Sequence, residues 1–270
     1  MRIIIFTAIF GRHQLSGRGA SRAWGIPHVC KPPDGWDLTY HLFTDKQTYD
    51  RTPALRAATL LKGGLWDVHL CQETARNPRL MARRIKIVDY LHLLPPHDVS
   101  IWVDANVSMV EKTCFERFQG VLPLAAPLWT LPHPARGCTY DEIEYCFQNG
   151  MTHDLKSFRL QRQVLKNEGF PRGIGLAETR ILGRRPTKEV TLFNEAWWSW
   201  FTLIPSHHLR DQCAFMPALW TCGILDRMVW LLPDDRREIF LIQREHKHRS
   251  EIPTFIRKRF RRTLNKTGLG

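Results

Sequence analysis

The sequence predicts an α/β fold with a mostly parallel central sheet covered by helices on both faces. Short apolar runs that end in turn or polar residues alternate with longer segments whose apolar residues recur at helical spacing. Strands that alternate with helices pack as a parallel sheet between helical layers. Hydrophobic residues make up 43% of the 270, enough for a substantial core, and no Gly/Ser-rich linker divides the chain. We therefore expect one domain over residues 1–250 and a basic tail over residues 251–270.

Eight segments have the composition and length of strands. The first lies in a short apolar stretch that has no small-residue cleavage pattern, so it indicates a strand and not a signal peptide. No apolar run approaches the roughly 18 to 20 residues that span a bilayer. The expected strands are Arg2–Ala8, Thr39–Thr44, Trp66–Leu70, Val99–Val103, Leu124–Thr130, Gly175–Leu182, Met228–Leu232 and Glu238–Gln243.

Five helices are expected between these strands. The segment Arg79–Leu94 has leucine and isoleucine at helical spacing and ends at two prolines, which cannot continue a helix. A second helix is expected to begin with a capping box, in which Thr139 caps the first turn and Glu142 reaches back to it. A third ends before a glycine. The remaining expected ranges are Thr139–Asn149, Asp154–Glu168, Thr187–Phe201 and Asp211–Thr221.

The composition excludes several classes of protein. The hydrophobic content rules out intrinsic disorder and a collagen-like chain. Seven cysteines without a CxxC pair do not form a disulfide framework, so we expect reduced thiols in a reducing compartment and a cytoplasmic location.

Positive charge is concentrated near the C-terminus. The net charge is +13, and residues 236–270 carry eleven basic and three acidic side chains. Within the tail, Ile256, Phe260 and Leu264 form an apolar stripe among cations, a pattern that binds anionic lipid at about 1 kcal/mol per Lys or Arg. We expect a peripheral contact with the inner face of a membrane, with a solvated tail as the alternative. Nucleic acid is not an expected partner, because no reader motif accompanies the charge.

One strand end carries two oxygen-bearing side chains. Asp104 and Asn106 follow the expected strand Val99–Val103 and are separated by one small residue. Ligands of open α/β sheets bind beyond the carboxyl ends of strands. Oxygen donors there can hold Mg²⁺ or Mn²⁺, which in turn can bridge to substrate phosphates. The same two residues also suit a simple turn.

Several further motifs follow one another along the chain. Arg83 and Lys86 lie on the helix before this strand, and after it come the segments His133–Arg136, Leu176–Thr179 and Arg210–Gln212, with a Trp-rich helix before the last. In this order the motifs resemble the glycosyltransferase-like domain family of plant mucilage-related and bacterial polysaccharide-locus proteins, over about residues 1–250. That family is similar to enzymes of the glycogenin and lipopolysaccharide-galactosyltransferase type. The resemblance implies a GT-A-like fold, in which a Rossmann-like sheet holds a nucleotide-sugar and an Asp-x-Asp binds the metal.

The resemblance implies a metal site for Mn²⁺ or Mg²⁺. Asp104 and Asn106 occupy the Asp-x-Asp positions, although the neutral amide of Asn106 removes one negative charge and should weaken metal binding. A histidine after the last strand often completes the metal shell in such folds. His246 and His248 are the candidates, with His246 preferred, and surface histidines in a basic segment are the alternative. The residues that usually surround this histidine in the family are missing here.

The resemblance also implies a donor site. Arg83 and Lys86, three residues apart on one helix face, would bind the diphosphate, with a solvated basic face as the alternative. Asp45 ends a strand where contacts to base and ribose arise in the family. Thr7 and Ala8 would lie in the loop under the uracil.

Five more residues receive roles from the resemblance. Asp211 would hold sugar hydroxyls, and Gln212 would lie near the anomeric centre. Glu178 would bind hydroxyls of the acceptor or donor, His133 would close over the donor, and Arg210 would pair with a carboxylate or phosphate. Helix capping by Asp211 and a salt bridge of Glu178 are the structural alternatives.

The expected function is therefore that of a nucleotide-sugar-dependent glycosyltransferase with a UDP-sugar donor. The resemblance favours transfer with retention of configuration to a hydroxyl of a glycan or a lipid-linked saccharide, in polysaccharide biosynthesis. Two alternatives stay open. A metal-dependent hydrolase could use the same Asp, Asn and His side chains, and a non-catalytic polyanion-binding protein would need only the positive charge.

Overall fold

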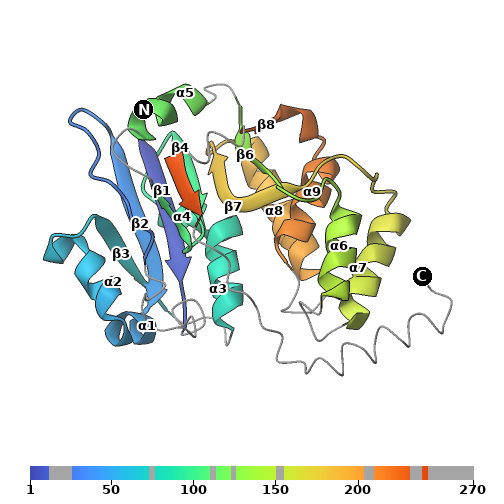
Figure 1. The fold of residues 1–270 in the computed structure, drawn as a ribbon, viewed down its shortest axis with the longest axis horizontal. Helices are drawn as coiled ribbons and strands as arrows, with labels where there is room; N and C mark the ends of the chain where they lie inside the picture. Colours follow the sequence, from blue (N-terminus) through green and yellow to red (C-terminus); the bar gives the residue numbers. More distant parts are fainter. Residues whose placement is uncertain are drawn as a thin grey trace.

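A seven-stranded sheet in the order β3-β2-β1-β4-β7-β6-β8 lies at the centre of the computed structural model (Figure 1). The structure describes residues 1–11, 26–72, 77–109, 114–122, 126–149, 155–203, 210–231 and 239–242. Two further strands, β5 and β9, form a separate pair. The strand bounds are β1 (Ile3–Ile9), β2 (Leu38–Asp45), β3 (Trp66–Cys71), β4 (Val99–Val103), β5 (Val107–Met109), β6 (Leu128–Pro132), β7 (Ala177–Arg184), β8 (Met228–Trp230) and β9 (Phe240–Ile242).

Helices follow most of the strands. In Figure 1, α1 and α2 lie beside β3 at one end of the molecule, and α6 and α7 lie at the other end. None of the helices within the described ranges is long and apolar enough to cross a membrane. The bounds are α1 (Lys46–Arg51), α2 (Pro53–Ala58), α3 (Pro78–Arg84), a π-helical segment (Ile85–Asp89), α4 (Tyr90–Leu93), α5 (Cys114–Val121), α6 (Thr139–Gln148), α7 (Leu155–Asn167), α8 (Lys188–Thr202), α9 (Gln212–Thr221) and the 3₁₀ turns Leu60–Lys62 and Leu225–Arg227.

All strands of the central sheet except β7 run in one direction. The pairs β3–β2, β2–β1, β1–β4 and β6–β8 are parallel, whereas β7 is antiparallel to both β4 and β6. The prediction of a mostly parallel α/β sheet is therefore confirmed. As a consequence, the amino end of β7 lies at the same edge of the sheet as the carboxyl ends of β1, β2, β4 and β6.

Apolar side chains cover both faces of the sheet. Alternate residues of a strand point to opposite faces, so Phe6 of β1 belongs to one hydrophobic cluster and its neighbour Ile5 to the other. The cluster around Phe6 includes residues of α3, α8 and α9, and the cluster around Ile5 includes residues of α2 and α5. Helices thus pack on both faces, as the sequence predicts.

Some element boundaries differ from the prediction. The strand expected over Leu124–Thr130 is observed as β6, which begins at Leu128 and runs two residues further, to Pro132; Leu124 and Ala125 lie outside the described residues. The last expected strand is the short β9, which pairs antiparallel with β5 and does not join the central sheet. The helix expected over Arg79–Leu94 contains a wider π turn in its middle.

The capping box predicted at Thr139 is wrong. Cys138 holds the N-cap position of α6, and the Thr139 hydroxyl has no hydrogen-bond partner within the described part of the chain. The Glu142 side chain is fully buried and binds arginines instead of reaching back to the first turn. Ion pairs with Arg136, just before the helix, and with the sequence-distant Arg210 have replaced the local cap.

Gly183 provides a test of the register between β6 and β7. It pairs with Trp129, and a Cβ atom at Gly183 would lie 1.8 Å from the indole. We expect Gly183→Ala to lower the free energy of unfolding by about 1–3 kcal/mol or more, because the rigid ring has to move in a packed core. Urea denaturation followed by tryptophan fluorescence measures the change. Gly120→Ala is the control, since this exposed helical position has open space around it and alanine favours a helix. Equal stabilities of the two variants would contradict the register.

Candidate functional site

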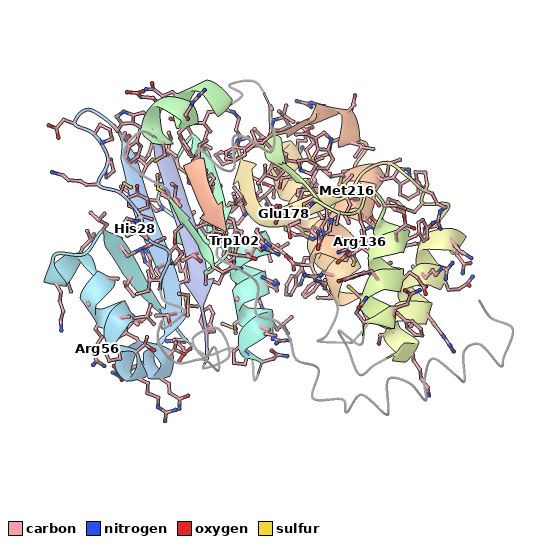
Figure 2. All side chains as sticks on the ribbon, in the orientation of Figure 1. His28, Arg56, Trp102, Arg136, Glu178 and Met216 are labelled. Carbon is pink, nitrogen blue, oxygen red and sulfur yellow. The ribbon has the colours of Figure 1, made fainter. Side chains whose placement is uncertain are left out.

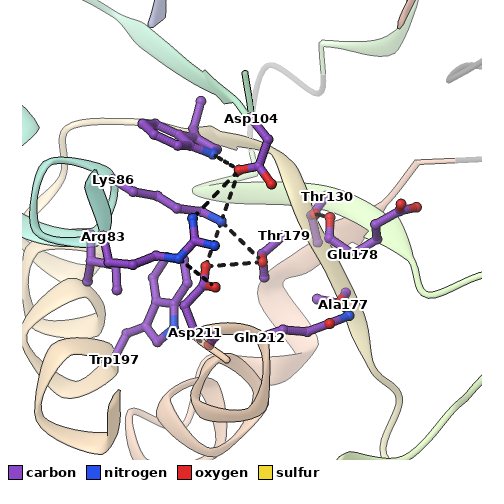
Figure 3. A network of polar contacts seen from close by, with 12 residues as sticks. Arg83, Lys86, Asp104, Thr130, Ala177, Glu178, Thr179, Trp197, Asp211 and Gln212 are labelled. Carbon is purple, nitrogen blue, oxygen red and sulfur yellow. Dashed lines mark hydrogen bonds and ion pairs between the residues drawn. The ribbon is translucent and has the colours of Figure 1, made fainter. Parts of the chain in front are cut away.

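A cluster of charged side chains lies where the carboxyl end of β4 meets the amino end of β7 (Figure 3). Its members come from four segments of the chain. Arg83 is near the end of α3, and Lys86 is in the π segment that follows. Asp104 is the first residue after β4, and Asp211 immediately precedes α9. The sequence predicted all four as site residues, and the structure brings them together.

Lys86 is at the centre of this cluster. Its side chain is 1% exposed, and its ammonium donates to Asp211 Oδ2 at 2.6 Å and to the Thr179 hydroxyl at 3.2 Å. Asp104 Oδ1 lies 3.6 Å from the same nitrogen. The rings of Trp102 and Trp197 lie 5.5 and 5.7 Å from it, within the range of cation–π attraction. Burial lowers the pKa of Lys86, and the charges of Asp211 and Asp104 oppose that shift.

The π segment that carries Lys86 is held by a second buried cation. Arg184, at the end of β7, donates to the Lys86 carbonyl at 2.7 Å and to Asn194 Oδ1 at 3.0 Å. Its guanidinium lies 3.8 Å from the centre of the Tyr90 ring. A π turn leaves backbone carbonyls without their usual helical partners, and such turns occur often at functional sites. Arg184 therefore stabilises the turn that directs Lys86 into the cluster.

Asp211 binds both basic residues of the α3 region. Arg83 Nε lies 2.9 Å from Oδ1, and Lys86 contacts Oδ2. Burial alone would raise the pKa of Asp211, but Arg83 and Lys86 outweigh it and hold the pKa well below the usual range. The structural alternative for Asp211, capping of α9, is wrong, because its side chain makes no cap hydrogen bond. The ion pairs use its oxygens instead.

Asp104 keeps one carboxylate oxygen free of the contacts drawn in Figure 3. Oδ1 accepts from the Trp102 indole N–H at 2.7 Å and faces Lys86, with Arg83 Nη1 at 4.0 Å. The side chain is 24% exposed. Asn106 lies two residues further on, half-buried, in the turn that leads into β5. An oxygen on a partly exposed carboxylate, with an amide nearby in the chain, fits a hard divalent cation.

Gln212 and Glu178 lie beside the cluster. Gln212 is buried, and its amide donates to the Ala177 carbonyl at 2.7 Å, which ties α9 to the start of β7. The Glu178 carboxylate lies 3.5 Å from Arg180 Nε and points away from Lys86 (Figure 3). The salt bridge considered as the structural alternative for Glu178 is therefore present.

A second charged cluster centres on Glu142, which the sequence indicated as part of a capping box and not as a site residue. This fully buried carboxylate binds Arg136 and, at 2.7 Å, Arg210 Nη1. His133 Nε2 lies 4.0 Å from it, and His133 Nδ1 accepts from the backbone N–H of Arg136 at 3.0 Å. Figure 2 shows Arg136 on the far side of Glu178 from Trp102, toward α6. Arg210, which binds Glu142, also contributes to the lowered pKa of Asp211, so the two clusters form one polar region.

A pocket of about 380 Å³ adjoins the Glu142 cluster. Its lining includes His133, Arg136 and Trp230 of β8. Burial lowers the pKa of His133, and nearby arginines add to that shift while the charge of Glu142 opposes it. The pocket thus combines an aromatic ring, an imidazole and a guanidinium, groups suited to a polar ligand of small size.

Three residues assigned to the donor site lie outside these clusters. The Asp45 carboxylate caps α1, with Oδ1 accepting from Thr48 N at 2.7 Å. Thr7 and Ala8 are buried inside β1, which ends at Ile9, one residue beyond the expected end at Ala8, so the prediction that they lie in a loop is wrong. The metal-ligand candidates His246 and His248, and the tail over residues 251–270, lie outside the residues that the structure describes.

Fold and site together define an α/β protein with a polar region at the carboxyl edge of its sheet. No family model matches the chain, and no curated protein matches it. Among solved structures, it is similar to the apo form of mouse xyloside xylosyltransferase 1, with 11% identity and a TM-score of 0.41 over 85% of this chain and 84% of that chain. A similarity at this level leaves the function to be inferred from the site itself.

We expect loss of Lys86 to lower the free energy of unfolding more than loss of Arg83 does. Lys86→Met leaves the buried Asp211 with one cation fewer and should cost about 3–5 kcal/mol, as when a buried pair is broken. Arg83→Met removes a side chain that is 31% exposed, so water can replace part of its contact with Asp211 and the loss should be smaller, about 1–3 kcal/mol. Urea unfolding measures both variants, with the exposed Lys46→Met as control. Equal losses for Lys86 and Arg83 would show that Lys86 does not anchor the cluster.

Proposed function

We propose that this chain is a nucleotide-sugar-dependent glycosyltransferase that uses a UDP-sugar and a divalent cation. The observation that carries the proposal is the joining of Arg83, Lys86, Asp104 and Asp211 at the carboxyl edge of the sheet. These residues belong to the motifs whose order resembles the glycosyltransferase-like family. Open α/β sheets bind nucleotides at this edge.

Asp104 and Asn106 are the residues that would hold Mn²⁺ or Mg²⁺. A cation there would supply positive charge to the diphosphate of the donor and so favour departure of the nucleotide. The oxygen of Asp104 that faces away from Lys86 is the one available for this contact. The neutral Asn106 leaves the site with less negative charge than two aspartates, so the affinity for the cation is modest.

Arg83 is the member of the cluster that can exchange partners. It is 31% exposed, whereas Lys86 is 1% exposed. When a diphosphate arrives, Arg83 can turn from Asp211 to a phosphate oxygen, which offers a charge-assisted hydrogen bond of comparable strength. Asp211 Oδ1 then becomes available to accept from a sugar hydroxyl. Lys86 stays on Oδ2 and keeps Asp211 ionised and in place throughout.

The acceptor is proposed to enter through the pocket beside Glu142. Its lining by His133, Arg136 and Trp230 can hold a hydroxyl-bearing sugar by hydrogen bonds and ring contact. The acceptor class is a glycan or a lipid-linked saccharide. Gln212 lies next to Asp211, and its amide is too weak a nucleophile for a stable covalent adduct. Transfer with retention can then proceed by attack from the face that the phosphate leaves, with that phosphate taking the acceptor proton.

A thermal-shift panel of UDP, GDP and CMP, each with and without Mn²⁺, tests the donor site. We expect UDP with Mn²⁺ to raise the melting temperature by several degrees, because a ligand stabilises the fold it binds. Asp104→Ala should abolish the dependence on Mn²⁺, and Arg83→Met should weaken UDP binding at least about tenfold through the lost phosphate contact. Asp50→Ala, at an exposed residue paired with Lys46, is the control.

The same panel separates the alternatives. A metal-dependent hydrolase turns over a sugar-free phosphoester or amide and binds UDP weakly. A polyanion-binding protein shows salt-sensitive binding to heparin that Asp104→Ala leaves unchanged. Either result, together with no shift on UDP and Mn²⁺, would refute the proposed transferase.

We also propose that the basic tail holds the enzyme on the cytoplasmic face of a membrane, near lipid-linked acceptors. Removing residues 254–270 should abolish binding to vesicles that contain phosphatidylserine, because five cations and four apolar side chains are lost from residues 255–264. Flotation on a density gradient measures binding, and phosphatidylcholine vesicles are the control. Hydrolysis of the donor should persist in the truncated protein. Undiminished flotation after truncation would exclude a role of the tail.

A further inference from the structure

Two histidines and an aspartate gather on the outer strands of the sheet, away from the candidate site. His41 lies in β2, and Asp67 and His69 lie in the edge strand β3. His41 pairs directly with Asp67, and His69 pairs with Phe43. Since side chains two residues apart on a strand share a face, all three side chains project on the same face of the sheet. The proposed transferase has no use for them.

The three ligand atoms are spaced as they would be around a small cation. His41 Nδ1 lies 2.8 Å from His69 Nε2, and Asp67 Oδ2 lies 3.6 and 3.4 Å from these nitrogens. The point equidistant from three atoms at these separations is about 1.9 Å from each, close to the roughly 2.0–2.1 Å of Zn–N and Zn–O bonds. A zinc ion slightly out of their plane would therefore reach all three without a change in the backbone.

Neighbouring side chains hold both imidazole rings in orientations that suit binding of a metal ion. His41 Nε2 lies 3.0 Å from the Thr39 hydroxyl, so a proton on Nε2 can be donated there while the lone pair of Nδ1 faces His69 and Asp67. Hydrogen bonding of the far nitrogen in this way is typical of metal-bound histidine. The His69 ring stacks on Phe43 and on His41, with centroids 4.8 and 5.1 Å apart. Burial, with a further contribution from His69, lowers the pKa of His41 to about 4, which keeps its ring neutral.

We propose that His41, Asp67 and His69 form a Zn²⁺ site that ties the edge strand β3 to β2. Two imidazoles and a carboxylate are a ligand set that zinc accepts, with a fourth position left for water. That position faces solvent, because the Asp67 side chain is 50% exposed and that of His69 is 32% exposed. Among the strands that the structure describes, only β2 lies beside β3, which otherwise makes one isolated bridge, between Trp66 and Thr59. A metal bridge between β2 and β3 therefore stabilises the edge strand of the sheet.

Zinc content of the full-length protein tests this site directly. The protein, freed of any histidine tag, is equilibrated with a small excess of ZnCl₂, dialysed against metal-free buffer and analysed by mass spectrometry of the metal. We expect one zinc per chain in the wild type and in Asp104→Ala. We expect the affinity for zinc to be at least tenfold weaker in His69→Ala and in Asp67→Asn, so that these variants lose zinc during dialysis. His92→Ala, at an exposed histidine on α4, is the matched control and should bind as the wild type does.

Stability provides a second readout. Zinc should raise the melting temperature of the wild type and leave that of His69→Ala unchanged, because a ligand stabilises only the fold that binds it. The metal-free melting temperatures of the two proteins should agree within a few degrees, which excludes misfolding of the variant. Equal zinc content in the wild type and His69→Ala would overturn the proposal, and so would loss of the zinc in Asp104→Ala. A wild type that retains no zinc would mean that the imidazoles only share a hydrogen bond.

Discussion

The site depends on one buried ion pair, that between Lys86 and Asp211. Taking an ammonium and a carboxylate out of water is costly, and the cost is recovered only when the remaining hydrogen-bonding capacity of both groups is used. Thr179, Asp104 and the rings of Trp102 and Trp197 satisfy Lys86, while Arg83 satisfies Asp211. The arrangement of four chain segments follows from that requirement.

The charged cluster around Lys86 has no net charge, which affects how strongly it attracts an anion. Arg83 and Lys86 carry two positive charges, and Asp104 and Asp211 carry two negative ones. A free diphosphate would therefore meet little net attraction unless a cation joined Asp104. The Glu142 cluster differs, because Arg136 and Arg210 share one carboxylate and leave a positive balance. The polar region thus has a neutral half around Lys86 and a positive half around Glu142.

Buried arginine and histidine act as structural elements elsewhere in the molecule. Arg184 supports the π turn under Lys86, and burial lowers its pKa to about 10. His41 is held between two strands by contacts with Thr39 and His69. In each case a polar side chain is kept inside the protein by specific hydrogen bonds, which also restrict its orientation. Replacing Arg184 or His41 would leave a buried hydrogen-bonding group without its partner.

Apolar periodicity by itself determined the class of the fold, the position of the central strands and the existence of the main helices, because burial of one face imposes a local and readable pattern. It also placed Asp104 correctly at the end of β4. Ion pairs between distant segments have no such pattern. The binding of Glu142 to Arg136 and Arg210 in place of a local cap, the support of Lys86 by Arg184, and the meeting of His41 with Asp67 and His69 were decided by the tertiary structure, since only strand order and helix packing set which charges become neighbours.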